Sequence, residues 1–598
     1  MGRAFMQSRA LWVVFGVLTV CGALLVPRQW YPLSWQVQWY QWFGPGDYSD
    51  RPGSDQGPDL TAEAYCPEDA FGWRKGQVID GVEIAPSPNC IADNPYLVAA
   101  AVKGTNNVSA ATLMQSGLTP DAVVMGRDLD GDGDPDEVHI RLEVTELNGS
   151  SPDRPDPMTQ YEIAPGIRPG LWVFTPKSVG MSTENFESVK ANPLLRAPSP
   201  AIRVEQGDKV YITLENTHYM PHTIHLHGVD HSFAQDHGMP HEESMSEHEV
   251  HGQGQNVAAH ERSVTPLGND GVAETSELPS MPARAHTYFI QPRVAGTMFY
   301  HCHVQANIHI LMGMQGLFVV EENRPNNWVQ TLNIGDGQVR HPSVAVREKF
   351  DREYDLHYED LYKGLSDVIQ SRIDPRLIIR DAHRRWDITQ DDPSYFLLNG
   401  RSFPYTMRES LIVVGAKEKV KLRMLNGGNK TVPVHPHGHK FTITHLDGIA
   451  VPPAARVIRD VIALNSAERV DVELDTTDDG LHSYGPGIWL MHDHQEVAQT
   501  TAGIYPGGSI TAIVYEDYLG ENGFPKVQGV EWKKFFTPEF YRREVPVWVD
   551  YDPLNRLADV TGSSRETIRF LLLGGVAGGW LAVLIALLRR PRAASAGV

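Results

Sequence analysis

A single cysteine placed between two histidines constrains this chain more than any other feature. The stretch GTMFYHCH ends at His303, and His309 and Met314 follow at short spacing. Cysteine, histidine and a weak axial methionine are the ligand set of a mononuclear electron-transfer copper site. Successive side chains of a β-strand point to opposite faces. Cys302 would therefore face one metal site while its neighbours His301 and His303 face another.

Three further motifs supply the histidines that the second site needs. They read PHTIHLHG, HPHGH and MHDH. In the first motif, the period-two rule places His225 and His227 on one face and His222 on the other, so His222 can join Cys302, His309 and Met314. The remaining imidazoles form four His-x-His pairs, which are enough for three copper ions. These eight residues are His225, His227, His301, His303, His435, His437, His492 and His494.

These four motifs resemble those of the multicopper oxidase family, over residues 195–520. The resemblance implies about four copper ions per chain, of three types. It assigns the type 2 copper to His225 and His435. It assigns the type 3 pair to His227, His301, His303, His437, His492 and His494. It assigns the type 1 copper to His222, Cys302, His309 and Met314.

One difference from the three-domain members of the family indicates which branch the chain resembles. The C-terminal motifs have Asp493 where the family's cysteine would sit and Val432 where the type 1 histidine would sit. This pattern resembles the two-domain branch, whose only type 1 copper lies in the N-terminal domain. That branch implies a homotrimer with three-copper clusters between subunits. His439 is left over, and we expect a structural role or a contact with a ligand. Asp493 is expected to fill the vacated type 1 position.

The predicted fold class is all-β, with two cupredoxin-like Greek-key β-sandwich domains, an N-terminal extension and terminal transmembrane helices. Short alternating runs such as 209–214 and 469–474 favour antiparallel sandwiches, and 598 residues exceed one core. The predicted segments are an N-terminal anchor or signal with an aromatic interfacial stretch (1–45), an N-terminal extension (46–140), cupredoxin domain 1 (141–325), cupredoxin domain 2 (326–522), a linker (523–567) and a C-terminal transmembrane helix (568–590).

Two apolar runs favour attachment to a membrane. Residues 10–26 follow two arginines, and residues 570–588 precede three. The second run is long enough to span a bilayer, and its arginines favour a cytoplasmic C-terminus. The first is either a cleaved signal or, as we favour, an uncleaved anchor. We therefore expect a cell-membrane protein with its catalytic domains on the periplasmic or extracellular side.

Charge and the remaining cysteines add two expectations. The net charge of −22 argues against a nucleic-acid partner. Cys66 and Cys90 form a disulfide if the compartment is oxidising, or are two unrelated thiols.

An acidic stretch near residue 130 resembles a calcium loop of the EF-hand type. The twelfth position is His139 rather than glutamate, so a solvated acidic turn stays open as the alternative. The candidate calcium ligands are Asp128, Asp130, Asp132, Asp134 and Asp136.

Two insertions are less specific. Residues 231–260 are rich in histidine and methionine, which suit copper; they either recruit and deliver copper or form a polar insertion. Residues 345–385 are charged, and we expect helix around 358–369 within an insertion between domains or at an oligomer contact.

The expected reaction is one-electron oxidation of a small reducing substrate, either a metal ion such as Cu(I) or a phenol-like donor. It is coupled to four-electron reduction of dioxygen to water. Cys302 would pass electrons to His301 and His303, and Asp230 and Glu496 could donate protons. The alternatives are a copper nitrite reductase, which needs only three type 2 histidines, and a non-catalytic copper-binding or sequestration protein.

Overall fold

A computed structural model of the chain divides into two compact units, residues 59–532 and residues 1–58 with 533–598. Several predictions fall outside the described residues: the aromatic stretch after residue 26, Cys66, Cys90, Asp230 and the 231–260 insertion. The structure describes residues 2–25, 77–79, 82–84, 119, 121–149, 161–177, 195–229, 279–339, 343, 349–371, 374–520, 523–527, 530, 532–542, 561 and 564–589.

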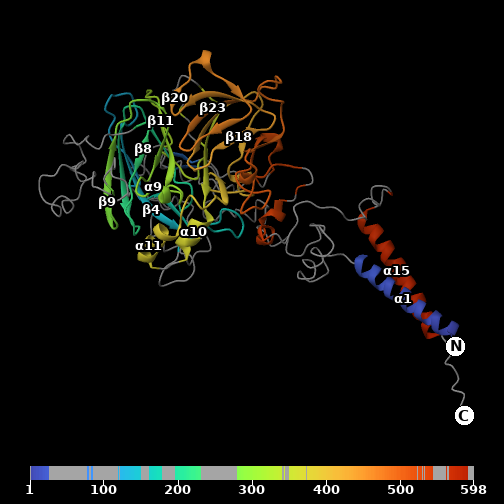
Figure 1. The fold of residues 1–598 in the computed structure, drawn as a ribbon. Helices are drawn as coiled ribbons and strands as arrows, with labels where there is room; N and C mark the ends of the chain where they lie inside the picture. Colours follow the sequence, from blue (N-terminus) through green and yellow to red (C-terminus); the bar gives the residue numbers. More distant parts are fainter. Residues whose placement is uncertain are drawn as a thin grey trace, which may run out of the picture. The chain divides into compact units, whose positions relative to one another are not determined.

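The first sandwich consists of two five-stranded sheets, coloured from cyan to green in Figure 1. One sheet contains β3 (Val123–Met125), β4 (Glu137–Leu147), β7 (Lys209–Asn216) and β9 (Arg284–Ile290), with β5 (Leu171–Pro176) paired to β4. The other contains β12 (Leu332–Asn333), β6 (Ala201–Glu205), β11 (Gln315–Glu321), β10 (Gly296–His301) and β8 (His225–His227). Since β3 and β4 begin before residue 141, this sandwich includes part of the segment predicted as an extension.

The second sandwich repeats this plan. Its larger sheet contains β13 (Gly337–Gln338), β14 (Arg352–Leu361), β17 (Lys419–Asn426), β23 (Arg469–Asp475), β19 (Phe441–Leu446) and β20 (Ile449–Ala450), joined by β15 (Tyr395–Leu398) and β21 (Ile458–Arg459). Its smaller sheet contains β16 (Ile412–Val414), β25 (Thr511–Tyr515), β24 (Ile488–Asp493), β18 (Val432–Pro436) and β22 (Ile462–Leu464).

Most strand pairs are antiparallel, as predicted for both sandwiches, but four pairs are not. The pairs β4–β7, β6–β11, β14–β17 and β16–β25 are parallel. The reason is that β6 and β7, although joined by a short turn at Gly207, lie in opposite sheets. The chain crosses from one sheet to the other at this turn instead of forming a hairpin. As a result β6 pairs with β11, and β7 pairs with β4, in parallel. The short repeated turn therefore separates sheets rather than paired strands.

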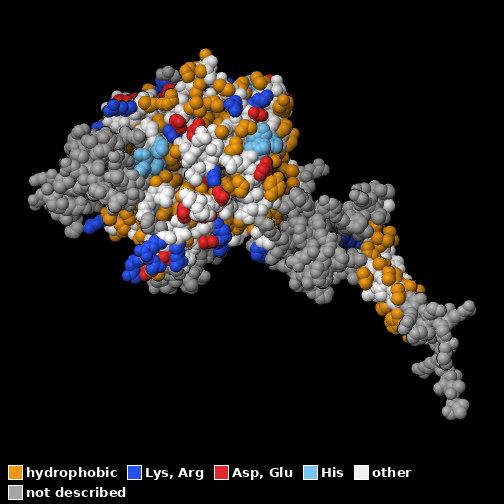
Figure 2. Space-filling model, in the orientation of Figure 1, with side chains coloured by type: hydrophobic (Ala, Val, Ile, Leu, Met, Phe, Trp, Pro, Cys, Tyr) orange, Lys and Arg blue, Asp and Glu red, His pale blue; other side chains and the backbone are white. Residues whose placement is uncertain are grey.

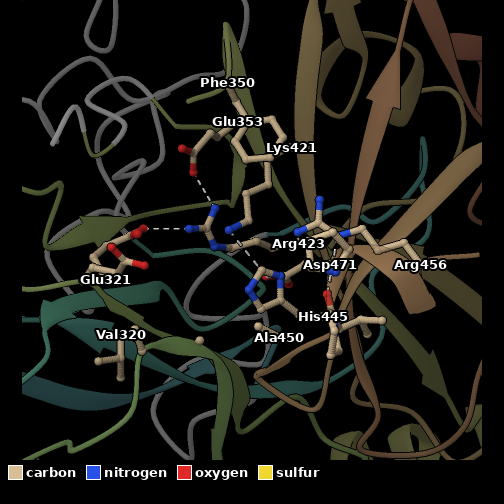
Figure 3. Close-up of a pocket in the computed structure, with 16 residues that line it drawn as sticks. Val320, Glu321, Phe350, Glu353, Lys421, Arg423, His445, Ala450, Arg456 and Asp471 are labelled. Carbon is tan, nitrogen blue, oxygen red and sulfur yellow. Dashed lines mark hydrogen bonds and ion pairs between the residues drawn. The ribbon is translucent and has the colours of Figure 1, made fainter. Parts of the chain in front are cut away.

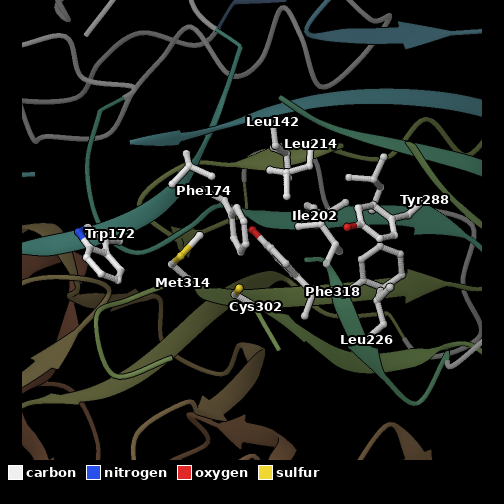
Figure 4. Close-up of a cluster of buried hydrophobic side chains, with 14 of the residues drawn as sticks. Leu142, Trp172, Phe174, Ile202, Leu214, Leu226, Tyr288, Cys302, Met314 and Phe318 are labelled. Carbon is white, nitrogen blue, oxygen red and sulfur yellow. The ribbon is translucent and has the colours of Figure 1, made fainter. Parts of the chain in front are cut away.

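Alternation of apolar and polar residues builds the core of the first sandwich. In β7 every second residue is buried, as expected for a strand with one face on the core. Figure 4 shows the aromatic side chains Phe174, Tyr288 and Phe318 in this buried cluster, with Cys302, Met314 and Trp172 at one end. The predicted ligands Cys302 and Met314 thus lie inside a buried hydrophobic core.

A buried charge network joins the two sandwiches. The Arg203 guanidinium of β6 donates to the Asp355 carboxylate of β14 at 2.6 and 2.9 Å. The Arg423 guanidinium of β17 donates to Glu321 of β11 at 2.8 Å and also to Glu353. Beside this network, a cavity of about 480 Å³ opens between strands of both sandwiches (Figure 3). Charged side chains from each side face one another across this seam.

The insertion before the second sandwich is partly strand. Residues up to Leu361 belong to β14, where we had expected helix, and only then does α10 (Lys363–Gln370) begin, followed by α11 (Pro375–Arg385). The end of β14 pairs with β15 and β17, so residues 358–361 are extended rather than helical. Shorter elements of this unit are α9 (Ala306–His309), α12 (Thr406–Glu409), η7 (Pro453–Ala455), η8 (Glu496–Gln499), η9 (Glu516–Tyr518), β1 (Gln77–Ile79) and β2 (Val82–Ile84).

The smaller unit contains two long apolar helices, α1 (Gly2–Leu25) and α15 (Arg565–Leu588), together with α13 (Pro538–Tyr541). The indole Nε1 of Trp580 donates to Thr19 Oγ1 at 3.2 Å, and its ring lies 4.8 Å from that of Phe15. Further along, Gly22 faces Val576, so the helices are antiparallel. By length and composition, α15 is a candidate membrane span over Thr567–Ala586, while the apolar part of α1 is shorter.

Candidate metal centre

The predicted mononuclear ligands converge at one end of the first core. The ligand atoms of His222, Cys302 and His309 all lie within 4.8 Å of one another. The Cys302 sulfur lies 3.2 Å from His309 Nδ1 and 3.6 Å from His222 Nδ1. Both imidazoles therefore present Nδ1 toward the thiol. Three soft or borderline donors around one point form a cation site of the kind that copper prefers.

The backbone around this group holds it in place. The amide of Thr223 donates to the Cys302 sulfur at 3.5 Å, and the Thr223 hydroxyl accepts from the His303 amide at 2.8 Å. The Cys302 amide donates to the carbonyl of Met314 at 3.0 Å, and Met314 is fully buried in the same cluster. An amide directed at sulfur favours the thiolate, which is the form that binds metal.

Burial keeps the two mononuclear imidazoles neutral. It lowers the pKa of His222 well below its usual range and lowers the pKa of His309 to about 3. A neutral imidazole is the form that ligates a metal. A buried cluster of neutral nitrogen donors and one thiol therefore fits a bound copper ion.

The first group of paired histidines lies on the other face of the same strand. His301 of β10 stands opposite His225 of β8 in the sheet register. The Nε2 atoms of His227 and His301 are 3.0 Å apart, and the His225 ring lies 4.9 Å from that of His303. Burial lowers the pKa of His227 to about 4. The alternation predicted for Cys302 and its neighbours thus places four imidazoles together and away from the mononuclear ligands.

The second group repeats this arrangement in the other sandwich. His435 of β18 stands opposite His492 of β24. The Nε2 atoms of His437 and His492 are 3.1 Å apart, and the His492 ring lies 5.3 Å from that of His494. His301 Nδ1 donates to the Cys302 carbonyl at 2.9 Å, and His492 Nδ1 donates to the Asp493 carbonyl at the same distance. In both groups, the other ring nitrogen of this histidine, Nε2, points toward a second imidazole of the same group.

The two groups occupy different places on the surface. Figure 2 shows histidine side chains in two separate patches, one over β8 and the other over β18. His227 and His303 are half-buried, and His494 is exposed. Each group therefore offers imidazoles to the outside of the chain, and each holds half of the eight histidines.

The vacated mononuclear position of the second sandwich is buried. Val432 belongs to the second hydrophobic core, and Asp493 is 3% exposed. The Asp493 carboxylate accepts from the Gln495 amide at 2.8 Å, while burial raises its pKa to about 7. His439 accepts or donates at 3.1 Å to the hydroxyls of Tyr515 and Ser483. Asp493 and His439 thus both have hydrogen-bond partners within the chain.

Glu496, the second predicted proton donor, begins the short helix η8. Its carboxylate is exposed and accepts from the Gln499 side chain at 3.2 Å. Its charge acts on His492, where it opposes the lowering of the pKa by burial and by His435. Glu496 thus lies near the second histidine group.

The acidic loop before β4 brings together three of its five aspartates. Carboxylate oxygens of Asp128, Asp130 and Asp136 lie within 4.8 Å of one another. Asp134 is turned away from them and accepts from the Asn327 amide at 2.8 Å. Asp132 accepts from the backbone amide of Asp134. Only part of the predicted ligand set is therefore gathered, and calcium binding stays a prediction.

The motifs did not reveal two residues beside the mononuclear group. The ring of Trp172 lies 5.3 Å from that of His309, edge to face, and His218 Nδ1 lies 2.8 Å from His222 Nε2. Trp172 is fifty residues upstream and has no spacing relation to the ligands. His218 stands four residues before His222, which was a visible signal.

Comparison with known proteins agrees with the motifs. The sequence profile of the family described as multicopper oxidase matches residues 173–324 and 377–508. No curated protein matches the chain.

Three solved structures illustrate the structural similarity. A multicopper oxidase named mgLAC shares 21% identity at a TM-score of 0.42, covering 68% of this chain and 94% of that chain. A blue copper oxidase from Nitrosomonas europaea shares 22% identity at a TM-score of 0.43, covering 68% and 93%. A copper nitrite reductase from the same organism shares 16% identity at a TM-score of 0.38, covering 65% and 99%.

The matched residues include the cysteine motif and all four His-x-His pairs. These two matched segments, which cover both sandwiches, are multicopper oxidase domains.

Proposed function

We propose that this protein is a copper oxidase that oxidises a small reducing donor one electron at a time and reduces dioxygen to water. The observation that carries the proposal is the single cysteine whose two neighbours belong to a second histidine group. When bound, copper at these residues supplies the electron transfer and the oxygen chemistry. A metal ion such as Cu(I) or a phenol-like molecule is the proposed donor.

The chain's own residues have separate roles in this proposal. Cys302, His222 and His309, with Met314, would hold the type 1 copper inside the buried core. His225 and His435 would hold the type 2 copper, and the other six paired histidines would hold the type 3 pair. Cys302 is linked to His301 and His303 through one peptide unit on each side. Glu496, near His492, would hold and deliver a proton, as would Asp230.

We further propose that the three-copper cluster is completed between chains in a homotrimer. Each histidine group has only half of the eight ligands, and Figure 2 shows the two patches apart on one chain. A head-to-tail ring would bring the first group of one chain against the second group of its neighbour. We propose that α15 anchors the assembly in the cell membrane, with the catalytic sandwiches on the periplasmic or extracellular side.

Metal analysis together with oxygen uptake tests the proposal. The expected result is about four copper ions per chain, with oxygen consumed in the presence of Cu(I), Fe(II), Mn(II) or a phenol. Two copper ions per chain and reduction of nitrite would instead identify a nitrite reductase. A fully loaded protein that consumes no oxygen with any donor would leave only copper sequestration.

A further inference from the structure

A third histidine stands directly behind one mononuclear ligand. His222 presents Nδ1 to the Cys302 sulfur, while its other ring nitrogen, Nε2, lies 2.8 Å from His218 Nδ1. Both imidazoles are buried, with exposed fractions of 0% and 6%. The remaining ligand differs, because His309 Nε2 is buried without a hydrogen-bond partner among the described residues. The two mononuclear imidazoles are thus supported unequally.

The hydrogen bond fixes which nitrogen carries each proton. If His222 binds a metal through Nδ1, its proton must be on Nε2, which then donates to His218 Nδ1. His218 must therefore carry its own proton on Nε2. That atom lies 3.7 Å from Glu146 Oε2, within reach of its charge but beyond hydrogen-bond distance, and it has no hydrogen-bond partner among the described residues. The metal position, His222, His218 and the charge of Glu146 therefore follow one another, with a hydrogen bond between the two imidazoles.

Aromatic rings hold His218 in this orientation. The ring of Tyr219 lies 3.9 Å from it, and the edge of Trp172 lies 4.8 Å from it. The His218 amide also donates to the Asn216 side chain at 2.9 Å. The imidazole is therefore packed on its faces and fixed at its backbone, which leaves its two nitrogens aimed at His222 and Glu146.

The second sandwich provides an internal comparison. Asn216 and Asn426 make the same turn: each side chain donates to the carbonyl four residues later and accepts from the amide two residues later. By this alignment His222 corresponds to Val432 and His218 corresponds to Gly428. The first sandwich therefore has both His222 and the histidine behind it, His218. The second sandwich has neither histidine at the corresponding positions.

The acidic partner follows the same alignment. Strand β4 pairs with β7 in the first sandwich in the same way that β14 pairs with β17 in the second. When the two strand pairs are aligned on Asn216 and Asn426, Glu146 corresponds to Asp360. Asp360 accepts from the amides of Asn429 and Lys430 at 2.7–3.1 Å. A carboxylate thus stands at this position in both sandwiches. In the first it faces an imidazole instead of backbone amides.

We infer that His218 and Glu146 are positioning residues for the type 1 copper. They hold His222 in the tautomer that presents Nδ1 and make it a stronger donor to the metal. This inference rests on the proposed copper site at His222, Cys302 and His309. An outer partner of this kind raises the basicity of a ligating histidine, and its loss typically costs roughly 10–100-fold in metal affinity. A stronger donor also favours Cu(II), so it lowers the reduction potential.

Three substitutions separate this role from simple packing. His218→Leu removes the acceptor, His218→Asn retains a carbonyl oxygen near the Nδ1 position, and Glu146→Gln removes only the charge. His286→Leu is the control, because His286 is also buried in the first sandwich, at 2% exposed, and packs against Tyr288. Each full-length variant is loaded with copper. The readouts are type 1 absorption and electron paramagnetic resonance, the reduction potential, and type 1 copper affinity against a chelator.

The leucine variant should lose roughly 10–100-fold in type 1 copper affinity, with an altered type 1 spectrum and a raised potential. The asparagine variant should recover most of the affinity and the parental potential, and Glu146→Gln should shift both readouts less and in the same direction as leucine. If His218→Leu does not fold, the other two variants carry the test. Parental spectra, affinity and potential in all folded variants would overturn the inference. A parent protein without any type 1 signal would instead refute the proposed copper site.

Discussion

The two sandwiches of this chain are built alike, but among the described residues only the first gathers a cysteine with two further histidines on the opposite side from its paired histidines. Each sets one histidine pair, on β8 or at the end of β18, against a second pair at the end of β10 or β24. Each uses the same hydrogen bond from a ring Nδ1 to the next carbonyl. The residue between the second pair is Cys302 in one and Asp493 in the other.

This difference shows that the paired histidines do not depend on a mononuclear site. Their geometry comes from strand alternation and from the pairing of adjacent strands, which both sandwiches share. The opposite face of the strand is free to change. In the first sandwich it faces His222 and His309, and in the second it faces a closed hydrophobic core with one buried carboxylate.

Substitution of the residue between the two histidines of the second pair, Cys302 or Asp493, should affect activity most differently in the two sandwiches. Cys302→Ser removes the thiolate that gives a type 1 copper its intense colour, so the blue absorption and donor oxidation should both vanish. Asp493→Asn, the matched change in the second sandwich, should retain both. Visible spectra and oxygen uptake of the two copper-loaded variants provide the measurement. A serine variant that keeps its blue colour and turnover would break the comparison.

Complementation should show whether the two histidine groups meet between chains. One variant combines His225→Ala with His227→Ala, and the other combines His437→Ala with His492→Ala. Each should be inactive alone. Co-expressed chains that assemble at random in a ring should recover about a quarter of the parental clusters, because each cluster then draws its halves from two chains. Oxygen uptake by the purified mixed assembly measures this. A mixture as inactive as its parts would place each cluster within one chain.

The seam between the sandwiches should respond strongly to the loss of one charge. Arg423→Met removes a buried partner of Glu353 and of Glu321, which keeps its contact with Arg203 at 3.3 Å, and loss of one buried partner typically costs about 3–5 kcal/mol. Lys363→Ala is the control, since its ion pair with Asp367 is exposed and is worth about 0–1 kcal/mol. Denaturant unfolding followed by fluorescence measures both. If the seam couples the sandwiches, the methionine variant should unfold in two steps, whereas a single unchanged transition would argue against coupling.

Asp493 should make the copper-free protein less stable as the pH rises. Its pKa is about 4 when unfolded and is raised to about 7 by burial in the folded state. The unfolded chain therefore releases its proton first, and stability falls between about pH 4 and pH 7, by up to about 4 kcal/mol. Asp493→Asn should flatten this part of the curve of unfolding free energy against pH. An unchanged slope would show that another group causes it.

Much of the site was predictable because it depends on local periodicity. The alternation of His301, Cys302 and His303 follows from the geometry of any strand, so their division between two sites needed no tertiary information. Spacing also indicated that His222 would join Cys302 while His225 would not. In contrast, spacing could not predict Trp172, which reaches His309 only because β5 packs on the same core.

The sequence by itself determined the two sandwiches, the grouping of the motif histidines and Cys302, and the apolar end segments, since these follow from residue type and short-range pattern. Only the tertiary structure decided the parallel strand pairs, the seam formed by Arg203 and Arg423, and the imidazole of His218 behind His222. It also showed that just three of the five loop aspartates converge. These features depend on contacts between strands and loops distant in the chain, and on the cost of burying charge, and neither has a local signature.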